Sequence, residues 1–366
     1  MNDSLNIAFF GSSLLSAYWN GAATYYRGII RALDSLGYRV TFYEPDAFDR
    51  QKHKDMEEPA WAAVHVYSAE GTDGVFHALE EARSADVLIK ASGVGVFDEL
   101  LEHEIPLMRR QGAMAIFWDV DAPATLDRLA QNPEDRFHSE VAKYDLILTY
   151  GGGDPVVHAY RKAGARQCIP IYNALDPLTH HAVSPDPDYN ASLSFLGNRL
   201  PDREARVEEF LLRAAELALN EQFLLGGNGW SDKPMPPNVR YAGHVGTAQH
   251  NAFNCTPRAV LNISRESMAR YGFSPATRVF EAAGAGACLI TDEWEGIPLF
   301  LEPSTEVLVA RDGAEVAEHL RRLSPRRASD IGQAAMKRVL SEHTYHHRGQ
   351  QVDAILTGRF SAVTGR

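Results

Sequence analysis

The chain has 366 residues, which at about 150 residues per domain predicts two or three domains. Hydrophobic residues make up 45% and charged residues 23%; this is globular composition and excludes a disordered chain. With 48 acidic and 36 basic residues, the net charge of -12 argues against a protein that coats nucleic acid.

The sequence favours a cytoplasmic protein. Three widely spaced cysteines make neither a disulfide framework nor a zinc pattern, and indicate a reducing compartment. The first residues, Met1 to Ser4, contain no basic segment of the kind that opens a signal peptide. We find no run of about 18 apolar residues, so we expect no membrane segment.

The first half of the chain alternates strand and helix patterns. A helix pattern with Ile29 and Leu33 on its apolar face stops at Gly37, a typical C-terminal signal. Short apolar runs, each ending in polar or glycine residues, predict buried strands at 5–10, 38–43, 86–90, 113–118 and 145–149. Strand, helix and strand at this spacing predict parallel pairing.

A proline-rich segment at 173–190, with Pro177, Pro185 and Pro187, reads as a linker. The alternation then restarts. We expect Asp202 to cap a helix, and predict strands at 193–197, 222–226, 259–263 and 288–291 and further helices at 278–287, 314–323 and 328–340.

These patterns predict an α/β protein with two Rossmann-like domains facing a cleft. The domains are residues 1–172 and 191–340, and a helix in 341–366 is expected to pack back on the first domain. Ligands of such sheets gather at the carboxyl ends of the strands. The sequence lacks both the dinucleotide-binding glycine fingerprint and the phosphate loop of NTPases.

The most informative stretch is 271–292. Ser274 and Pro275 fit the start of a helix, whose free N–H groups, with Arg278 one turn in, would bind an anion. Glu281 lies three residues further on the same face, where a carboxylate could accept both hydroxyls of a ribose. The alternative is a surface ion pair between Arg278 and Glu281.

This stretch resembles the donor-binding motif of GT-B glycosyltransferases, and most closely that of the spore-maturation (CgeB-like) group. The resemblance extends over residues 110–357, through segments at 144–149, 160–165, 173–177, 195–203 and 342–348. It implies a GT-B fold whose second domain binds a nucleotide-diphospho-sugar and whose first domain binds the acceptor.

The resemblance implies further donor-binding residues. The turn after the strand at 193–197 would face the donor phosphates, and the loop after 241 would lie beside the base. The residues concerned are Gly197, Asn198, Arg199, Arg203, Gly243 and His244. An ordinary turn and a structural histidine are the alternatives. Many retaining enzymes carry a glutamate eight residues before the ribose-binding one, where this chain has Phe273, so the stereochemistry stays open.

The catalytic candidates follow the strand at 113–118. An inverting transfer needs a general base near the acceptor oxygen, and the Asp-x-Pro pattern favours Asp121 over Asp119. A helix N-cap and a metal-binding Asp-x-Asp are the alternatives. Ser12, Ser13, Asn20 and Gly21 would line the acceptor side, unless they form a plain turn and helix cap.

The sequence therefore predicts a metal-independent glycosyltransferase that needs no cofactor. Its donor would be a UDP-, GDP- or dTDP-sugar, and its acceptor a hydroxyl on a polysaccharide, a protein or a small molecule. Two alternatives remain: a nucleotide-sugar epimerase of the same shape, and a non-catalytic two-domain sugar-binding protein. No nucleic-acid partner is expected, and the oligomeric state is not predicted.

Overall fold

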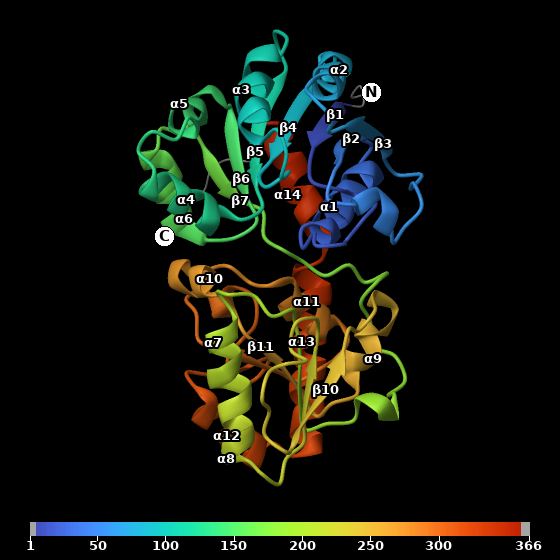
Figure 1. The fold of residues 1–366 in the computed structure, drawn as a ribbon, viewed down its shortest axis with the longest axis vertical. Coiled ribbons are helices and arrows are strands. Elements are labelled where there is room, and N and C mark those ends of the chain that lie inside the picture. Colours follow the sequence, from blue (N-terminus) through green and yellow to red (C-terminus); the bar gives the residue numbers. More distant parts are fainter. Residues whose placement is uncertain (1–4, 360–366) are drawn as a thin grey trace. The chain divides into compact units, whose positions relative to one another are not determined.

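The computed structural model describes residues 5–359 and divides into two compact units (Figure 1). The first unit contains the chain up to Tyr172 and the segment that begins at Tyr345, and the second unit contains Asn173–Thr344. Within the described range, no helix is both long and apolar enough to span a membrane.

The first unit is built on a seven-stranded parallel sheet of order β3-β2-β1-β4-β5-β6-β7. Four of the five predicted strands fall within two residues of the observed bounds; β2 runs three residues further than predicted. β3 and β7 were not predicted. The strands are β1 (Asn6–Phe10), β2 (Arg39–Asp46), β3 (Ala63–Ser68), β4 (Val87–Ala91), β5 (Met114–Asp119), β6 (Leu146–Thr149) and β7 (Cys168–Pro170).

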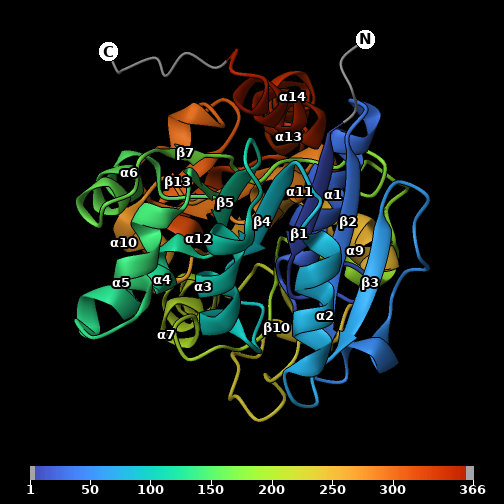
Figure 2. The same ribbon diagram turned by 90° about the horizontal axis from the view of Figure 1, so that it is seen from above.

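Helices cover both faces of this sheet, with α2 and α3 on one face and α14 on the other (Figure 2). The C-terminal helix α14 packs against α1, and α1 buries the predicted apolar face through Ile29 and Leu33. The helices are α1 (Ala23–Ser35), α2 (Asp73–Ala82), α3 (Asp98–Met108), α4 (Ala122–Gln131), α5 (Phe137–Glu140), α6 (Gly153–Lys162) and α14 (Tyr345–Leu356).

The second unit has a six-stranded parallel sheet of order β10-β9-β8-β11-β12-β13. Its strands are β8 (Leu193–Leu196), β9 (Phe223–Gly226), β10 (Val239–Gly243), β11 (Ala259–Asn262), β12 (Leu289–Asp292) and β13 (Leu308–Ala310). Its helices are α7 (Glu204–Val207), a π-helical stretch (Glu208–Leu212), α8 (Arg213–Leu217), α9 (His250–Cys255), α10 (Glu266–Tyr271), α11 (Thr277–Gly284), α12 (Gly313–Arg322) and α13 (Pro325–Glu342).

Each sheet has one point where the strand order reverses. In the first unit this point lies between β1 and β4, and in the second between β8 and β11. The helices that follow two such strands leave in opposite directions, which opens a crevice at the carboxyl ends. Ligand-binding residues are therefore expected after β1, β4, β8 and β11.

Two predicted helix starts are wrong. The N-cap of α7 is Arg203, because the Asp202 carboxylate instead accepts a hydrogen bond from Arg265 Nε at 2.5 Å. Helix α11 begins at Thr277 after the N-cap Ala276, so Ser274 and Pro275 lie in the preceding loop.

The proline-rich segment 173–190 lies within the second unit. Leu175 is fully buried, and its N–H donates to the carbonyl of His343 at 2.8 Å. The buried Leu175 side chain and its backbone hydrogen bond fix the start of this segment. Its loop-like composition therefore does not make it a freely moving linker.

Candidate functional site

The guanidinium group of Arg278 joins the ends of β8 and β11. Its Nη2 donates to the carbonyl of Leu196, and its Nη1 donates to Asn262 Oδ1 at 3.1 Å. It lies over the ring of Phe195, 4.8 Å from the ring centre. Arg278 therefore stands at the reversal point of the second sheet, where a ligand is expected.

Arg203 brings a second guanidinium group to the same place. Its Nη1 donates to the carbonyl of Asn198 at 3.1 Å, and its buried Nε has no hydrogen-bond partner. A Cβ atom built on Gly197 would lie 3.2 Å from Arg203 Nη1 and 3.2 Å from Arg278 Nη2. Both positive groups therefore flank the turn at Gly197.

No carboxylate of the described residues forms an ion pair with Arg203 or Arg278. Burial, and then the charge of Arg203, lower the pKa of Arg278 to about 10. Burial, and then the charge of Arg265, also lower the pKa of Arg203. Burial and a neighbouring cation disfavour the charge of each of these arginines, and an anion placed beside them stabilises that charge, so this turn suits a phosphate group.

Glycines let three strand ends come together at this turn. Gly197 N–H donates to the carbonyl of Gly226 at 2.9 Å, and Gly227 N–H donates to that of Gly243 at 2.7 Å. Gly227 has φ +116°, and a Cβ atom there would lie 2.3 Å from the Gly197 carbonyl oxygen. Only glycine fits this position, so the close approach of the two turns depends on it.

Glu281 lies one turn beyond Arg278 on α11, and the surface ion pair considered as an alternative does not form. The partly buried carboxylate instead faces His180, with 3.8 Å between Glu281 Oε1 and His180 Nε2. The sequence did not point to His180, which lies in the segment predicted as a linker.

Ser274 and Pro275 fix a loop and do not cap the helix. The buried hydroxyl of Ser274 donates to the Gly272 carbonyl at 2.9 Å, and the Pro275 carbonyl accepts from Asn173 Nδ2 at 3.1 Å. Phe273, directly before Ser274, has φ +46°, a conformation that costs about 1–3 kcal/mol in a residue with a side chain. The loop before α11 is thus held in a strained conformation.

The remaining predicted donor residues differ in what their side chains do. Arg199 forms ion pairs with Glu204 at 2.6 Å and with Asp232 at 3.0 Å, so its charge is already balanced. Asn198 Oδ1 accepts from the Asn228 N–H at 2.9 Å. His244 is exposed directly after Gly243, the last residue of β10.

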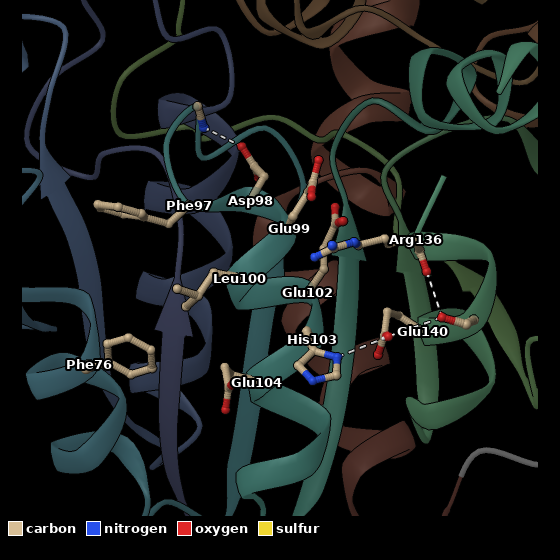
Figure 3. Close-up of a pocket in the computed structure, with 12 residues that line it drawn as sticks. Phe76, Phe97, Asp98, Glu99, Leu100, Glu102, His103, Glu104, Arg136 and Glu140 are labelled. Carbon is tan, nitrogen blue, oxygen red and sulfur yellow. Dashed lines mark hydrogen bonds and ion pairs between the residues drawn. The ribbon is translucent and has the colours of Figure 1, made fainter. Parts of the chain in front are cut away.

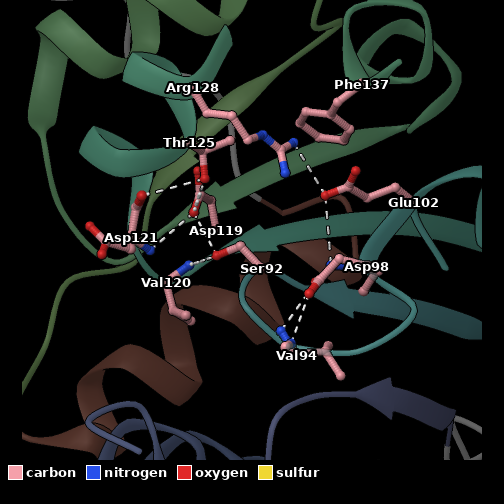
Figure 4. A network of polar contacts seen from close by, with 12 residues as sticks. Ser92, Val94, Asp98, Glu102, Asp119, Val120, Asp121, Thr125, Arg128 and Phe137 are labelled. Carbon is pink, nitrogen blue, oxygen red and sulfur yellow. Dashed lines mark hydrogen bonds and ion pairs between the residues drawn. The ribbon is translucent and has the colours of Figure 1, made fainter. Parts of the chain in front are cut away.

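In the first unit, Asp119 is fully buried at the end of β5. Its Oδ1 accepts from the hydroxyls of Ser92 at 2.7 Å and Thr125 at 3.1 Å and from the Asp121 N–H at 3.0 Å (Figure 4). Its Oδ2 accepts from the Tyr160 hydroxyl. Burial raises the pKa of Asp119 above its ordinary value. A carboxylate enclosed by four donors organises the fold and is poorly placed to contact an acceptor.

Asp121 is the better placed of the two candidates. It occupies the N-cap position of α4 without a side-chain capping bond and is partly exposed. Its side chain points away from that of Asp119 (Figure 4). Asp121 is thus the N-cap residue of α4, as the helix-cap alternative expects, but its side chain does not form the capping hydrogen bond.

Most residues expected on the acceptor side are buried. Ser12 Oγ donates to Asn20 Oδ1 at 2.9 Å, and Ser13 Oγ donates to Glu44 Oε1 at 3.0 Å. The Asn20 amide donates back to the Ser13 carbonyl at 2.8 Å. These three side chains therefore hold the turn after β1, as the alternative of a plain turn expects, but none of them caps α1, whose N-cap is Ala22. Of the four residues only Gly21 is exposed.

A pocket of about 820 Å³ lies along α3 in the first unit (Figure 3). It contains none of the predicted site residues. Carboxylates predominate in its lining, which includes Asp98, Glu99, Glu102, Glu104 and Glu140, with Phe76 and Phe97 beside them. Three of these carboxylates are ion-paired, Asp98 and Glu102 with Lys90 and Glu140 with Lys143.

Comparison with known proteins supports this architecture. The structure of HepE from Anabaena, in complex with UDP-glucose, is similar with a TM-score of 0.68 and 13% identity, over 97% of this chain and 100% of that one. Sucrose-phosphate synthase from Thermosynechococcus elongatus gives 0.68 and 13% identity, over 98% and 100%. BGT of phage T4 in complex with UDP-glucose gives 0.61 and 11% identity, over 96% and 99%.

The chain has the GT-B fold. This confirms the predicted fold class, an α/β protein with two Rossmann-like domains. A family model of glycosyl transferase-like proteins matches residues 203–354, which include Arg203, Arg278 and Glu281. These findings support the predicted glycosyltransferase and do not favour the epimerase or the sugar-binding protein. No curated protein matches the chain.

Proposed function

We propose that the protein transfers a sugar from a nucleoside-diphosphate sugar to an acceptor hydroxyl, with the donor bound by the second unit. The observation that carries the proposal is the pair of guanidinium groups of Arg203 and Arg278, which flank Gly197 without a balancing carboxylate. The proposal extends to membership of the spore-maturation group, which the sequence motifs resemble.

The chemistry places charge where these two arginines lie. The bond between the anomeric carbon of the sugar and the β-phosphate oxygen breaks, and the nucleoside diphosphate leaves with that electron pair. Fixed positive groups aimed at the leaving oxygens stabilise the transition state more than the ground state. In this proposal Arg203 and Arg278 supply that charge in place of a metal ion, and no other cofactor takes part.

The acceptor oxygen forms the new bond to the anomeric carbon, and its proton passes to a base in the first unit. Asp121 is the proposed base, because its carboxylate is partly exposed at the end of β5 while that of Asp119 is enclosed. Glu281 is proposed to accept hydrogen bonds from the donor ribose, since no described residue donates a hydrogen bond to its carboxylate.

Uridine is the first base to test, because several similar structures contain UDP or UDP-glucose. The proposal includes a cytoplasmic location, which the three free cysteines support.

Thermal unfolding with UDP, GDP, ADP, CDP and dTDP tests the proposal. A nucleotide at about 100 times its Kd stabilises the protein by about 2.7 kcal/mol, so the matching base raises the Tm. Arg278→Ala is expected to abolish this rise, while Arg213→Ala, which removes an exposed ion pair with Glu209, keeps it. A Tm that none of the five nucleotides raises contradicts the proposal.

A further inference from the structure

Two neighbouring loops of the first unit carry exposed aromatic side chains. Strands β1 and β2 pair in parallel and lie side by side (Figure 1), so the loops that follow them start from the same edge of the sheet. Tyr18 and Trp19 in the first loop are 41% and 66% exposed, and Phe48 in the second loop is 55% exposed. In the described part of the chain, Phe76 is the only other exposed Phe, Trp or Tyr. Exposed rings are therefore concentrated at the edge where ligands of such a sheet gather.

The two loops hold these rings in fixed positions. The buried Asn20 amide donates to the carbonyls of Ser13 at 2.8 Å and Ser16 at 3.0 Å, which closes the first loop. The Ser16 hydroxyl donates to the carbonyl of His53 in the second loop at 2.7 Å. The Tyr18 ring also stacks on that of His53, with 4.1 Å between the ring centres and 23° between the planes. A ligand therefore meets rings that are already ordered, which lowers the entropy cost of binding.

Trp19 and Phe48 are held in a backbone conformation that residues with large side chains avoid. Their φ angles are +47° and +56°, in the left-handed region that is unfavourable for bulky residues. The Phe48 ring is held by the guanidinium group of Arg50, whose Cζ lies 4.9 Å from the ring centre. Both side chains remain exposed, so burial within the described fold does not compensate for the strain. Strain of this kind is typical of ligand-binding sites, and a ligand that covers the two rings supplies the missing burial.

The surroundings of the rings are polar and contain paired charges. Lys52 pairs with Asp49 in the second loop at 2.7 Å, and Arg27 pairs with Asp55 at 2.7 Å. Asp55 also accepts from the Ala17 N–H at 3.0 Å, so this second pair lies against the first loop. An entirely apolar ligand would cover these groups without hydrogen bonds. A saccharide suits them, because its C–H faces stack on aromatic rings while its hydroxyl groups bond to polar neighbours.

We propose that the acceptor is a saccharide, and that Tyr18, Trp19 and Phe48 form an aromatic platform on which its sugar rings stack. The inference rests on the proposed function and selects one acceptor class from those that the sequence left open. All strands of the first sheet are parallel, so the loops of the aromatic platform and the proposed base Asp121, which follows β5, leave the sheet at the same edge. A saccharide bound on the platform therefore lies at the edge of the unit that carries the base.

An array of immobilised oligosaccharides, peptides and flavonoids, probed with the fluorescently labelled full chain, tests this inference. We expect binding to oligosaccharides and to neither of the other two classes. The strongest oligosaccharide ligand is then titrated by calorimetry in solution. Trp19→Ala is expected to weaken its binding by about tenfold, the effect of losing one stacked ring, and Tyr18→Ala and Phe48→Ala also weaken it.

Three further variants separate stacking from a purely structural role. Trp19→Phe keeps an aromatic ring and most of the affinity. Trp19→Gly loses affinity as Trp19→Ala does, yet its Tm is higher than that of Trp19→Ala, because glycine adopts a φ of +47° without strain. Phe76→Ala removes the exposed ring on α2 and keeps the wild-type affinity.

The outcomes distinguish this inference from the proposed function. A wild type that binds no oligosaccharide, while a nucleotide raises its Tm, overturns the inference alone, and so does binding of peptides or flavonoids in place of oligosaccharides. A wild type that binds neither oligosaccharides nor nucleotides contradicts the proposed function as well. The inference is also overturned when the alanine variants of Tyr18, Trp19 and Phe48 all keep the wild-type affinity, or when Phe76→Ala weakens binding as much as they do.

Discussion

Two aspartates separated by one residue have different environments and therefore different roles. The carboxylate of Asp119 accepts four hydrogen bonds in the interior, whereas Asp121 is partly exposed at the start of α4. A pattern of residue types cannot separate these roles, because it contains no information on which side chains surround each carboxylate.

The difference predicts opposite effects of the same substitution. Asp119→Asn places an amide donor against hydroxyl and N–H donors, and we expect a loss of about 1–3 kcal/mol in the free energy of unfolding, measured by urea denaturation. Asp121→Asn costs less stability but lowers donor hydrolysis, followed as nucleoside diphosphate release, by about 100-fold or more. Full activity of Asp121→Asn contradicts its role as base.

At the scale of elements, the turns after β8 and β9 together form the proposed anion site. The Gly197 carbonyl accepts from Trp230 Nε1 at 2.8 Å, and the Gly227 backbone packs directly on that carbonyl. The position of the Gly197 turn between the two arginines thus depends on the turn after β9, which supplies none of the charged side chains.

Gly227→Ala is expected to damage both stability and binding. The added Cβ atom would lie 2.3 Å from a backbone oxygen in a residue with φ +116°, so the two turns must separate, at a cost of about 1–3 kcal/mol. Chemical denaturation measures the loss, and titration with the matching nucleotide shows weaker binding. Gly21→Ala, with no atom within 4 Å of the new Cβ, serves as control; equal behaviour of the two variants contradicts the argument.

At the scale of the whole molecule, the chain combines a net charge of -12 with a local pair of unbalanced cations. Other arginines of the second unit, such as Arg199 and Arg206, are neutralised by carboxylates. Arg203 and Arg278 instead bring two guanidinium groups to the turn at Gly197, where the proposed leaving group lies.

This distribution predicts that the reaction needs no metal ion. If Arg203 and Arg278 neutralise the diphosphate, excess EDTA leaves the nucleotide affinity and the rate of donor hydrolysis unchanged, since a bound cation is not the electrophile. The same assay after dialysis against EDTA, with and without added Mg²⁺ or Mn²⁺, measures this. A rate that disappears with EDTA and returns with metal contradicts the proposal.

The sequence by itself determined the α/β class, most strands of both sheets and the motif with Arg278 and Glu281. These follow from apolar runs and from spacings within one element, which depend on near neighbours. Strands β7 and β13, of three residues each, are too short to be recognised in this way, and β3 and β10 are interrupted by polar residues such as His65 and Arg240. Helix α11 begins later than its Ser-Pro start signal because that loop is held by a distant contact with Asn173.

The tertiary structure decided which charges are available. Arg199 is neutralised by Asp232, 33 residues away, while Arg278 reaches a carbonyl 82 residues away and keeps its charge unbalanced. The same long-range packing encloses Asp119 and places His180, from a segment of loop composition, opposite Glu281. Such contacts depend on how distant segments fold together, so no local pattern contains them.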